Sequence, residues 1–238
     1  MSASVFDRVL VVTAHPDDVD FGASGTVSGM TADGTTVTYC VVTDGDAGGF
    51  DPTVARDDIP GIRRAEQVAA ASAVGVSDVR FLGYRDGQLT VSHDLRRDIA
   101  RVIRQTRPQL VICQTPDRNY RRIYVSHPDH MAAGEAALQA VYPDARNPFA
   151  HPSLLADEGL QEWSVDTVWV MGRENPDHFV DITEQLPHKL GALAAHESQT
   201  AHLDDLESMI TDWGSRLARR AGLAEGRLAE AYTVIDTR

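Results

Sequence analysis

Short apolar runs rich in β-branched residues alternate along the chain with longer segments of helical period. The strand-like runs cover residues 9–12, 36–43, 79–82, 110–113 and 165–171, with a last short run at 233–235. A run of this length predicts a strand that is buried on both faces, as in a parallel sheet. Helical segments are expected at residues 19–32, 63–74, 93–106, 130–141, 182–196 and 202–224. The alternation predicts an α/β fold with a mostly parallel sheet, in which residues 233–235 form an edge strand.

Length and composition indicate one domain. The chain has 238 residues, of which 42% are hydrophobic and 24% are charged. These values suit one large α/β domain with a substantial core, and we expect a single domain over residues 1–238. Only residues 142–162, which contain Pro143, Pro148 and Pro152, are expected to form a long irregular excursion on the surface.

Charge and the lack of a targeting segment narrow the range of partners. The formal net charge is −13, which repels nucleic acid phosphates and anionic lipid headgroups. Residues 1–8 have neither a basic region nor an apolar stretch of signal-peptide length, and no later segment approaches a membrane span. We therefore expect a cytoplasmic protein without nucleic acid or membrane partners. Cys40 and Cys113 lie in strand-like runs and are expected to be free, buried thiols.

Two histidine-aspartate clusters follow buried strands. AHPDD at residues 14–18 comes after the run at 9–12, and HPDH at residues 127–130 lies downstream of the run at 110–113. In open parallel sheets, ligands bind outside the carboxyl ends of the strands, at the point where the strand order reverses. Both clusters are therefore expected where such sheets carry out chemistry.

The spacing within the clusters predicts a metal site. His15 and Asp18 are three residues apart, so they share one face of a first helical turn while Asp17 points elsewhere. His127 and His130 have the same spacing, with a proline that favours a helix start, so one can ligate while the other faces a substrate. Three protein ligands with an open fourth position are typical of catalytic zinc. Two imidazoles and a carboxylate suit Zn²⁺ best, and they also accommodate Fe²⁺ or Co²⁺.

More ordinary explanations exist for parts of this pattern. Carboxylates at a helix N-terminus are commonly caps, but two such clusters that both follow buried strands are hard to explain by capping alone. The glycine-rich loop at residues 43–49 does not begin an EF-hand, because Ala55 stands where the twelfth, acidic ligand belongs. The first strand-to-helix turn lacks the glycine fingerprint of a dinucleotide site. A metal site remains the favoured interpretation.

The motifs together resemble the PIG-L/LmbE-like family of zinc-dependent N-deacetylases. They are, in order, AHPDD at 14–18, TDGDAGG at 43–49, RRAE at 63–66, FLGYRDG at 81–87, HPDH at 127–130 and HESQ at 196–199. The resemblance implies a Rossmann-like three-layer fold and hydrolysis of the N-acetyl group of an amino sugar, often an N-acetylglucosamine conjugate.

The same resemblance assigns roles to five residues. It implies that His15, Asp18 and His130 are the metal ligands and that Asp17 is the general base. Asp17 would take a proton from the metal-bound water, and the resulting hydroxide would attack the amide carbonyl. His127, cationic for part of the cycle, would stabilise the tetrahedral oxyanion or protonate the leaving amine.

Substrate contacts and supporting residues are less specific. Arg63 matches a sugar-binding arginine, with a solvated helix face as the ordinary alternative. Asp86 could accept hydrogen bonds from sugar hydroxyls, or it is simply a turn residue before Gly87. Asp129 either orients an imidazole from behind or caps a helix.

Two more positions keep two interpretations each. Some family members place a tyrosine at the position of Val125, and here Tyr124 either takes over its role or leaves the oxyanion to His127 alone. His196 either closes the site from a late helix or is a buried histidine with satisfied hydrogen bonds.

Two other functions stay open. A metal-dependent amidase could cleave a larger sugar conjugate with the same residues, and a non-catalytic Rossmann-like binding module would hold no stoichiometric metal. The choice of acyl group is expected at residues 142–162 and at the basic loop 118–122. Arg118, Arg121 and Arg122 either receive an anionic substituent of the substrate or are ordinary surface arginines. The sequence leaves the oligomeric state open, a homo-oligomer included.

Overall fold

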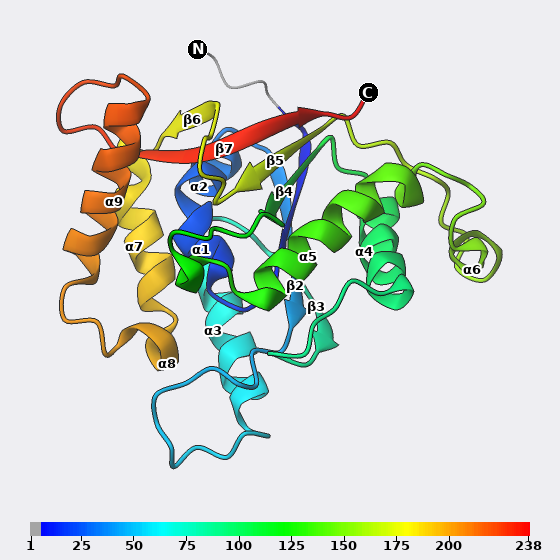
Figure 1. Cartoon of the computed structure of the whole chain (residues 1–238), viewed down its shortest axis with the longest axis horizontal. Coiled ribbons are helices and arrows are strands. Elements are labelled where there is room, and N and C mark those ends of the chain that lie inside the picture. Colours follow the sequence, from blue (N-terminus) through cyan, green and yellow to red (C-terminus); the bar gives the residue numbers. More distant parts are fainter. Residues whose placement is uncertain (1–5) are drawn as a thin grey trace.

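A computed structural model describes residues 6–238, and their strands form one seven-stranded sheet (Figure 1). The strands are β1 (Arg8–Thr13), β2 (Thr36–Thr43), β3 (Asp78–Tyr84), β4 (Leu110–Gln114), β5 (Thr167–Met171), β6 (His178–Asp181) and β7 (Ala229–Asp236). Their order across the sheet is β3-β2-β1-β4-β5-β7-β6. Strands β1 to β5 are parallel to one another, whereas β7 runs antiparallel to both β5 and β6. The predicted α/β fold with a mostly parallel sheet is confirmed.

Helices cover both faces of this sheet. They are α1 (Asp18–Gly22), α2 (Ser24–Ala32), α3 (Ile59–Ala73), α4 (His93–Thr106), α5 (Pro128–Gln139), α6 (Pro152–Ala156), α7 (Leu186–Ala194), α8 (Glu197–Thr200) and α9 (Leu206–Arg220). Figure 1 shows α4 and α5 on one side of the strands and α1, α2, α3 and α7 on the other. The result is the three-layer arrangement that the family resemblance implied.

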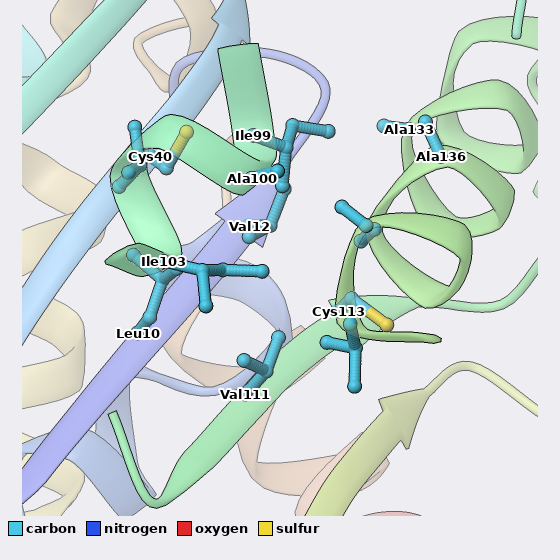
Figure 2. Packing of buried hydrophobic residues seen from close by; sticks show 14 of the residues in the cluster. Leu10, Val12, Cys40, Ile99, Ala100, Ile103, Val111, Cys113, Ala133 and Ala136 are labelled. Carbon is cyan, nitrogen blue, oxygen red and sulfur yellow. The ribbon is translucent and has the colours of Figure 1, made fainter. Parts of the chain in front are cut away.

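The apolar runs are continuous because successive residues of a central strand enter different cores. Leu10 and Val12 of β1 pack with Val111 of β4 against Ile99 and Ile103 of α4, as Figure 2 shows. The alternate residues of β1 belong to the second core, under α1, α2 and α3. A strand that is buried on both faces cannot alternate polar with apolar residues, and this produced the signal in the sequence.

The free cysteines are buried, as expected. Cys40 and Cys113 both lie in the core beneath α4 and α5, where burial raises the pKa of each thiol to about 12. Neither thiol is therefore ionised near neutral pH.

The last strand differs from its prediction. Residues 233–235 were expected to form a short edge strand, and they belong to the longer strand β7, which begins at Ala229. Residues 233–236 pair with β5 alone, whereas residues 229–232 pair with β6. The first half of β7 does not appear as an apolar run, because it contains Glu230. This buried carboxylate pairs with Lys189 Nζ at 2.7 Å. The strand is therefore longer than predicted, while its predicted part lies at an edge of the sheet.

Two further segments are more structured than the sequence indicated. The helix expected over residues 19–32 is divided at Ala23 into α1 and α2. The excursion over residues 142–162 contains α6 and the fully buried side chain of Leu154, so it is not purely a surface loop. Within residues 6–238, no helix combines the length and the apolar character that crossing a membrane requires. The prediction about the start of the chain rests largely on residues 1–5, which lie outside the described residues.

The sheet has its reversal of strand order beside β1. The chain moves from β1 outward to β2 and β3, and then returns to place β4 on the opposite side of β1. The loops that follow β1 and β4 therefore meet at the carboxyl edge of the sheet, where ligands of such folds bind.

Candidate metal centre and active site

Hydrogen bonds between strands fix the loop that carries the first cluster. The Ala14 N–H donates to Gln114 Oε1 at the end of β4 (2.8 Å), and the Ala14 carbonyl accepts the Thr43 N–H from β2 (2.8 Å). The next residue, His15, donates its own N–H to Asp18 Oδ2 (2.7 Å). His15 and Asp18 are thus held together by the loop, not by a shared helical turn, because α1 begins only at Asp18.

The three predicted metal ligands lie close together. His15 Nδ1 lies 3.1 Å from His130 Nε2, and the Asp18 carboxylate lies 3.4 Å from the first nitrogen and 3.0 Å from the second. Ligand atoms at roughly 2.0–2.1 Å from a tetrahedral zinc are about 3.3 Å apart. The spacings are therefore close to those of zinc ligands, with the two distances to Asp18 measured to its two different oxygens.

His15 is supported from behind by two carboxylates. Its Nε2 lies 3.1 Å from Asp86 Oδ1 and 3.3 Å from Asp129 Oδ2. A ring nitrogen that faces two carboxylates keeps its proton, so a bound metal would replace the proton on Nδ1. Asp129 is fully buried and also accepts the N–H groups of Gly87 (2.7 Å) and Leu89 (3.2 Å). Its carboxylate is directed at His15 and at these two amides, not at the N-terminus of α5.

The electrostatics of the centre favour positive charge. Burial lowers the pKa of His15, but the carboxylates of Asp129, Asp18 and Asp86 outweigh it and raise the pKa to about 12. Burial raises the pKa of Asp18, yet the charge and hydrogen bond of His130, together with His15, hold it well below the usual value. A set of side chains that stabilises a proton this strongly also suits a cation, which replaces that proton.

Asp17 lies beside the three ligands with a different set of contacts. Its backbone has φ 94°, its N–H donates to Gln67 Oε1 (2.8 Å), and its carboxylate accepts Arg63 Nη2 (3.0 Å). Burial and the charge of Asp18 raise the pKa of Asp17 to about 7, against the opposing charge of Arg63. A carboxylate with a pKa near neutrality can both accept and release a proton.

Arg63 is not on a solvated helix face. It is 3% exposed, and its guanidinium donates to the carbonyl oxygens of Pro16 and Gly45 as well as to Asp17. A side chain at Gly45 would begin 2.5 Å from Arg63 Nη1, so glycine lets the loop after β2 lie against the guanidinium. The sugar contact predicted for Arg63 stays a prediction.

His127 completes the cluster from the N-terminus of α5. Its ring centroid lies 4.8 Å from that of His15, and its Nδ1 accepts the Asp129 N–H (3.2 Å). Burial and the positive charges of His15 and His130 lower the pKa of His127. A neutral ring that accepts at Nδ1 carries its proton on Nε2, where it is a hydrogen-bond donor.

The remaining predicted residues lie in three different settings. Asp86 is nearly buried and contacts His15 and Arg63 (4.0 Å), not open space. Tyr124 is 72% exposed, with the Arg122 guanidinium over its ring. His196 is fully buried and does not close the mouth of the site.

Three polar residues of the site were missed from the sequence. Gln67, Asp20 and Gln114 are all buried, and each fixes a part of the β1–α1 segment. Gln67 had a usable signal, because it lies four residues after Arg63 and therefore on the same face of α3. Asp20 and Gln114 belong to no motif and had none.

Comparisons with known proteins agree with the fold and the motifs. The family model "PIG-L: GlcNAc-PI de-N-acetylase" matches residues 10–141, more than half of the chain. The diacetylchitobiose deacetylase of Thermococcus kodakarensis is 33% identical over 192 residues, which cover 81% of this chain and 70% of that protein. A probable N-acetyl-alpha-D-glucosaminyl L-malate deacetylase 2 of Bacillus cereus is 35% identical over 211 residues, covering 85% and 89%.

Similar solved structures include a deacetylase and an enzyme of another class. The N,N'-diacetylchitobiose deacetylase of Pyrococcus horikoshii, complexed with its inhibitor MPG, has a TM-score of 0.89 and 28% identity, and the match covers 98% of this chain and 85% of that one. GalB, a 4-carboxy-2-hydroxymuconate hydratase, has a TM-score of 0.80 at 21% identity and shares the fold alone. The enzyme class predicted from the motifs agrees with the named functions of the deacetylase relatives. On its motifs, its family match and its relatives, the chain belongs to the PIG-L family.

Proposed function

We propose that this protein is a metal-dependent N-deacetylase that removes the acetyl group from an N-acetylglucosamine-type amino sugar or its conjugate. The observation that carries the proposal is the convergence of His15, Asp18 and His130 within 3.4 Å of one another, with the Asp17 carboxylate beside them. Fold alone would not be enough, because a hydratase shares it.

His15, Asp18 and His130 hold the metal in this proposal, and Zn²⁺ is the preferred ion, with Fe²⁺ and Co²⁺ as alternatives. A bound cation of this kind supplies Lewis acidity, which lowers the pKa of a coordinated water and polarises a carbonyl oxygen. Asp86 and Asp129 keep the proton of His15 on Nε2 and so leave Nδ1 free for the metal. The donor set supports a catalytic site, since it leaves a coordination position open.

Asp17 accepts the proton of the attacking water. Its hydrogen bond from Arg63 and the fixed N–H bond to Gln67 hold the carboxylate in one place, which general base catalysis requires. His127 donates from Nε2 to the oxyanion that forms at the amide carbon. Asp17, once it has taken the proton of the water, releases that proton to the departing amine, and its carboxylate is regenerated.

The substrate is assigned by what the relatives share. The named relatives act on diacetylchitobiose, on N-acetyl-alpha-D-glucosaminyl L-malate and on an inositol glycoside of acetamido-deoxyglucose. An N-acetylated glucosamine unit is common to all three, whereas the attached group differs. Arg118 lines a hollow of about 260 Å³ between the loops after β4 and β5. These loops leave the same carboxyl edge of the sheet as the metal ligands, which supports placing the attached group there.

The decisive experiment measures release of free amine from a panel of N-acetylglucosamine glycosides. Zinc-reconstituted protein is compared with chelator-stripped protein and with His130→Ala, and the thermal unfolding midpoint and bound zinc of each sample are recorded. Metal-dependent release supports the proposal, together with a zinc-induced rise in the midpoint that His130→Ala lacks. One bound zinc without release points to an amidase of larger conjugates, and a protein that binds no zinc points to a non-catalytic binding module.

A further inference from the structure

The backbone of Asp17 is in a conformation that its surroundings must maintain. Its φ of 94° lies in the region that favours glycine, and it is larger than the φ of 51° at Arg107 and 49° at His151. Residues held so far outside the usual regions persist only where neighbouring groups determine the backbone. The contacts that hold Asp17 therefore decide where its carboxylate lies.

Gln67 provides one of these contacts and has a single possible orientation. Its side chain is fully buried on α3, where Oε1 accepts the Asp17 N–H (2.8 Å) and Nε2 donates to Asp20 Oδ2 (2.8 Å). A backbone N–H can only donate, so the amide oxygen must face Asp17 and the amide nitrogen must face Asp20. The position of Gln67 is thus set by the carboxylate of Asp20.

Asp20 is held in turn by a histidine from the other end of the chain. His196, between α7 and α8, places Nε2 at 2.8 Å from Asp20 Oδ2, and both side chains are 0% exposed. A series of hydrogen bonds therefore connects His196 to Asp20, Asp20 to Gln67, and Gln67 to the Asp17 backbone, although these residues come from three separate segments.

Stability alone does not explain this series of polar groups. Asp20 Oδ1 and His196 Nδ1 are buried and have no hydrogen-bond partner among residues 6–238. Buried polar atoms without partners are unfavourable, and apolar side chains of similar size would fill the same space without that cost. What the polar residues offer, and apolar ones do not, is a directed hydrogen bond to Asp17.

We propose that His196, Asp20 and Gln67 are positioning residues that hold the Asp17 backbone and so aim its carboxylate at the reacting water. The inference rests on the proposed function, in which Asp17 is the general base. It predicts a role for His196, the first residue of the HESQ motif, that requires no contact with substrate or metal.

His196→Leu tests the proposal, because it fills the space but cannot donate to Asp20. We expect kcat to fall by about 10- to 100-fold, with KM changed by less than about twofold and bound zinc unchanged. His196→Gln, whose amide N–H can reach Asp20, should recover most of the lost kcat. Gln67→Met removes the next link and should give the same pattern, so the proposal can be tested even if one variant does not fold.

Ser198→Ala is the matched control. It removes a hydrogen bond to Glu66 Oε2 (2.7 Å) at the neighbouring contact between α3 and α8, without touching the series that leads to Asp17. Its kcat should equal that of the wild type. Wild-type kcat in both His196→Leu and Gln67→Met would overturn the proposal, as would an equal loss in Ser198→Ala at a similar unfolding midpoint. Full activity in Asp17→Asn, measured in parallel, would instead remove the role of Asp17 as general base, and a wild type without metal-dependent amine release would remove the proposed function itself.

Discussion

Arg63 Nη2 lies 3.0 Å from the carboxylate of Asp17, and the same guanidinium donates to the carbonyl oxygens of Pro16 and Gly45. One buried cation thus fastens the loops after β1 and β2 to each other and to the proposed base. The planar fork of arginine makes several such bonds at once, which a lysine ammonium on its flexible stem cannot reproduce. The arrangement assigns Arg63 a part in holding Asp17, in addition to any contact with substrate.

Arg63→Lys should therefore lower kcat more than it raises KM. We expect kcat to fall by about 10- to 100-fold while bound zinc stays at the wild-type level, because the charge remains but the fixed geometry of Asp17 is lost. Steady-state kinetics on an N-acetylglucosamine glycoside provides the measurement. A variant with unchanged kcat and a raised KM would mean that Arg63 acts as the sugar contact predicted from the sequence, and not through Asp17.

Two other variants should distinguish a residue that transfers the proton from one that binds the metal. Asp17→Asn keeps the size of the side chain and leaves the three ligands in place, so bound zinc should remain at one ion per chain. Its kcat should fall by about 100- to 10,000-fold, since an amide cannot accept the proton. His130→Ala should lose both zinc and turnover. Elemental analysis and amine release check the pair, and full activity in either variant would contradict the roles given to these residues.

The sequence predicted the parallel strands well, for a physical reason. β1, β2 and β4 are buried on both faces and therefore appear as continuous apolar runs. β6 was not predicted, because it is a half-buried strand of only four residues with His178 and Asp181 at its ends. The first half of β7 was not predicted because it contains the charged residue Glu230. Its burial depends on Lys189, which lies 41 positions away in the sequence.

The site was predicted in part. The convergence of His15 and His130, 115 residues apart, followed from motifs that both come after central strands. The residues behind them were not predictable in the same way. Gln67 and Asp20 act through hydrogen bonds between elements. Asp20 belongs to no motif, and the only signal for Gln67 is its position four residues after Arg63 on α3. Sequence reasoning therefore identified the groups proposed to react and named His196, but it missed Gln67 and Asp20, which connect His196 to Asp17.

Arg104 should be a major contributor to stability, far from the site. It is 2% exposed on α4, and its guanidinium donates to five carbonyl oxygens of the following segment, those of Asp144, Ala145, Asn147, Ala150 and Leu160. Arg104→Met fills the space but leaves these carbonyls without a donor. We expect the free energy of unfolding to fall by about 3 kcal/mol, measured by urea titration.

Arg101→Ala is the comparison for Arg104→Met. Arg101 lies on the same helix, is partly exposed and pairs with Glu158 at 2.8 Å. Exposed ion pairs contribute little, so this variant should lose less than about 1 kcal/mol. Equal losses in the two variants would show that the carbonyl contacts of Arg104 do not stabilise residues 144–160.

Asp144 should make stability depend on pH in the acid range. Its carboxylate accepts Arg96 Nε (2.9 Å) and Nη2 (2.6 Å) and lies 3.0 Å from His151 Nε2. Burial raises the pKa of Asp144, but Arg96 and His151 outweigh it and hold the pKa below its usual value. The unfolded chain, where the carboxyl has its ordinary pKa, therefore binds the proton at a higher pH than the folded chain does.

The stabilisation from Asp144 is thus fully present above the unfolded pKa and is lost as pH falls towards the folded pKa. Asp144→Asn cannot titrate, so its unfolding free energy should be about 2 kcal/mol lower at pH 7 and should decline less steeply below about pH 4. Asp94→Asn removes a carboxylate whose side chain is 72% exposed and should leave the acid limb unchanged. Urea titrations from pH 7 to pH 3 distinguish these outcomes. An acid limb for Asp144→Asn that runs parallel to the wild type would mean that other carboxylates cause the acid sensitivity.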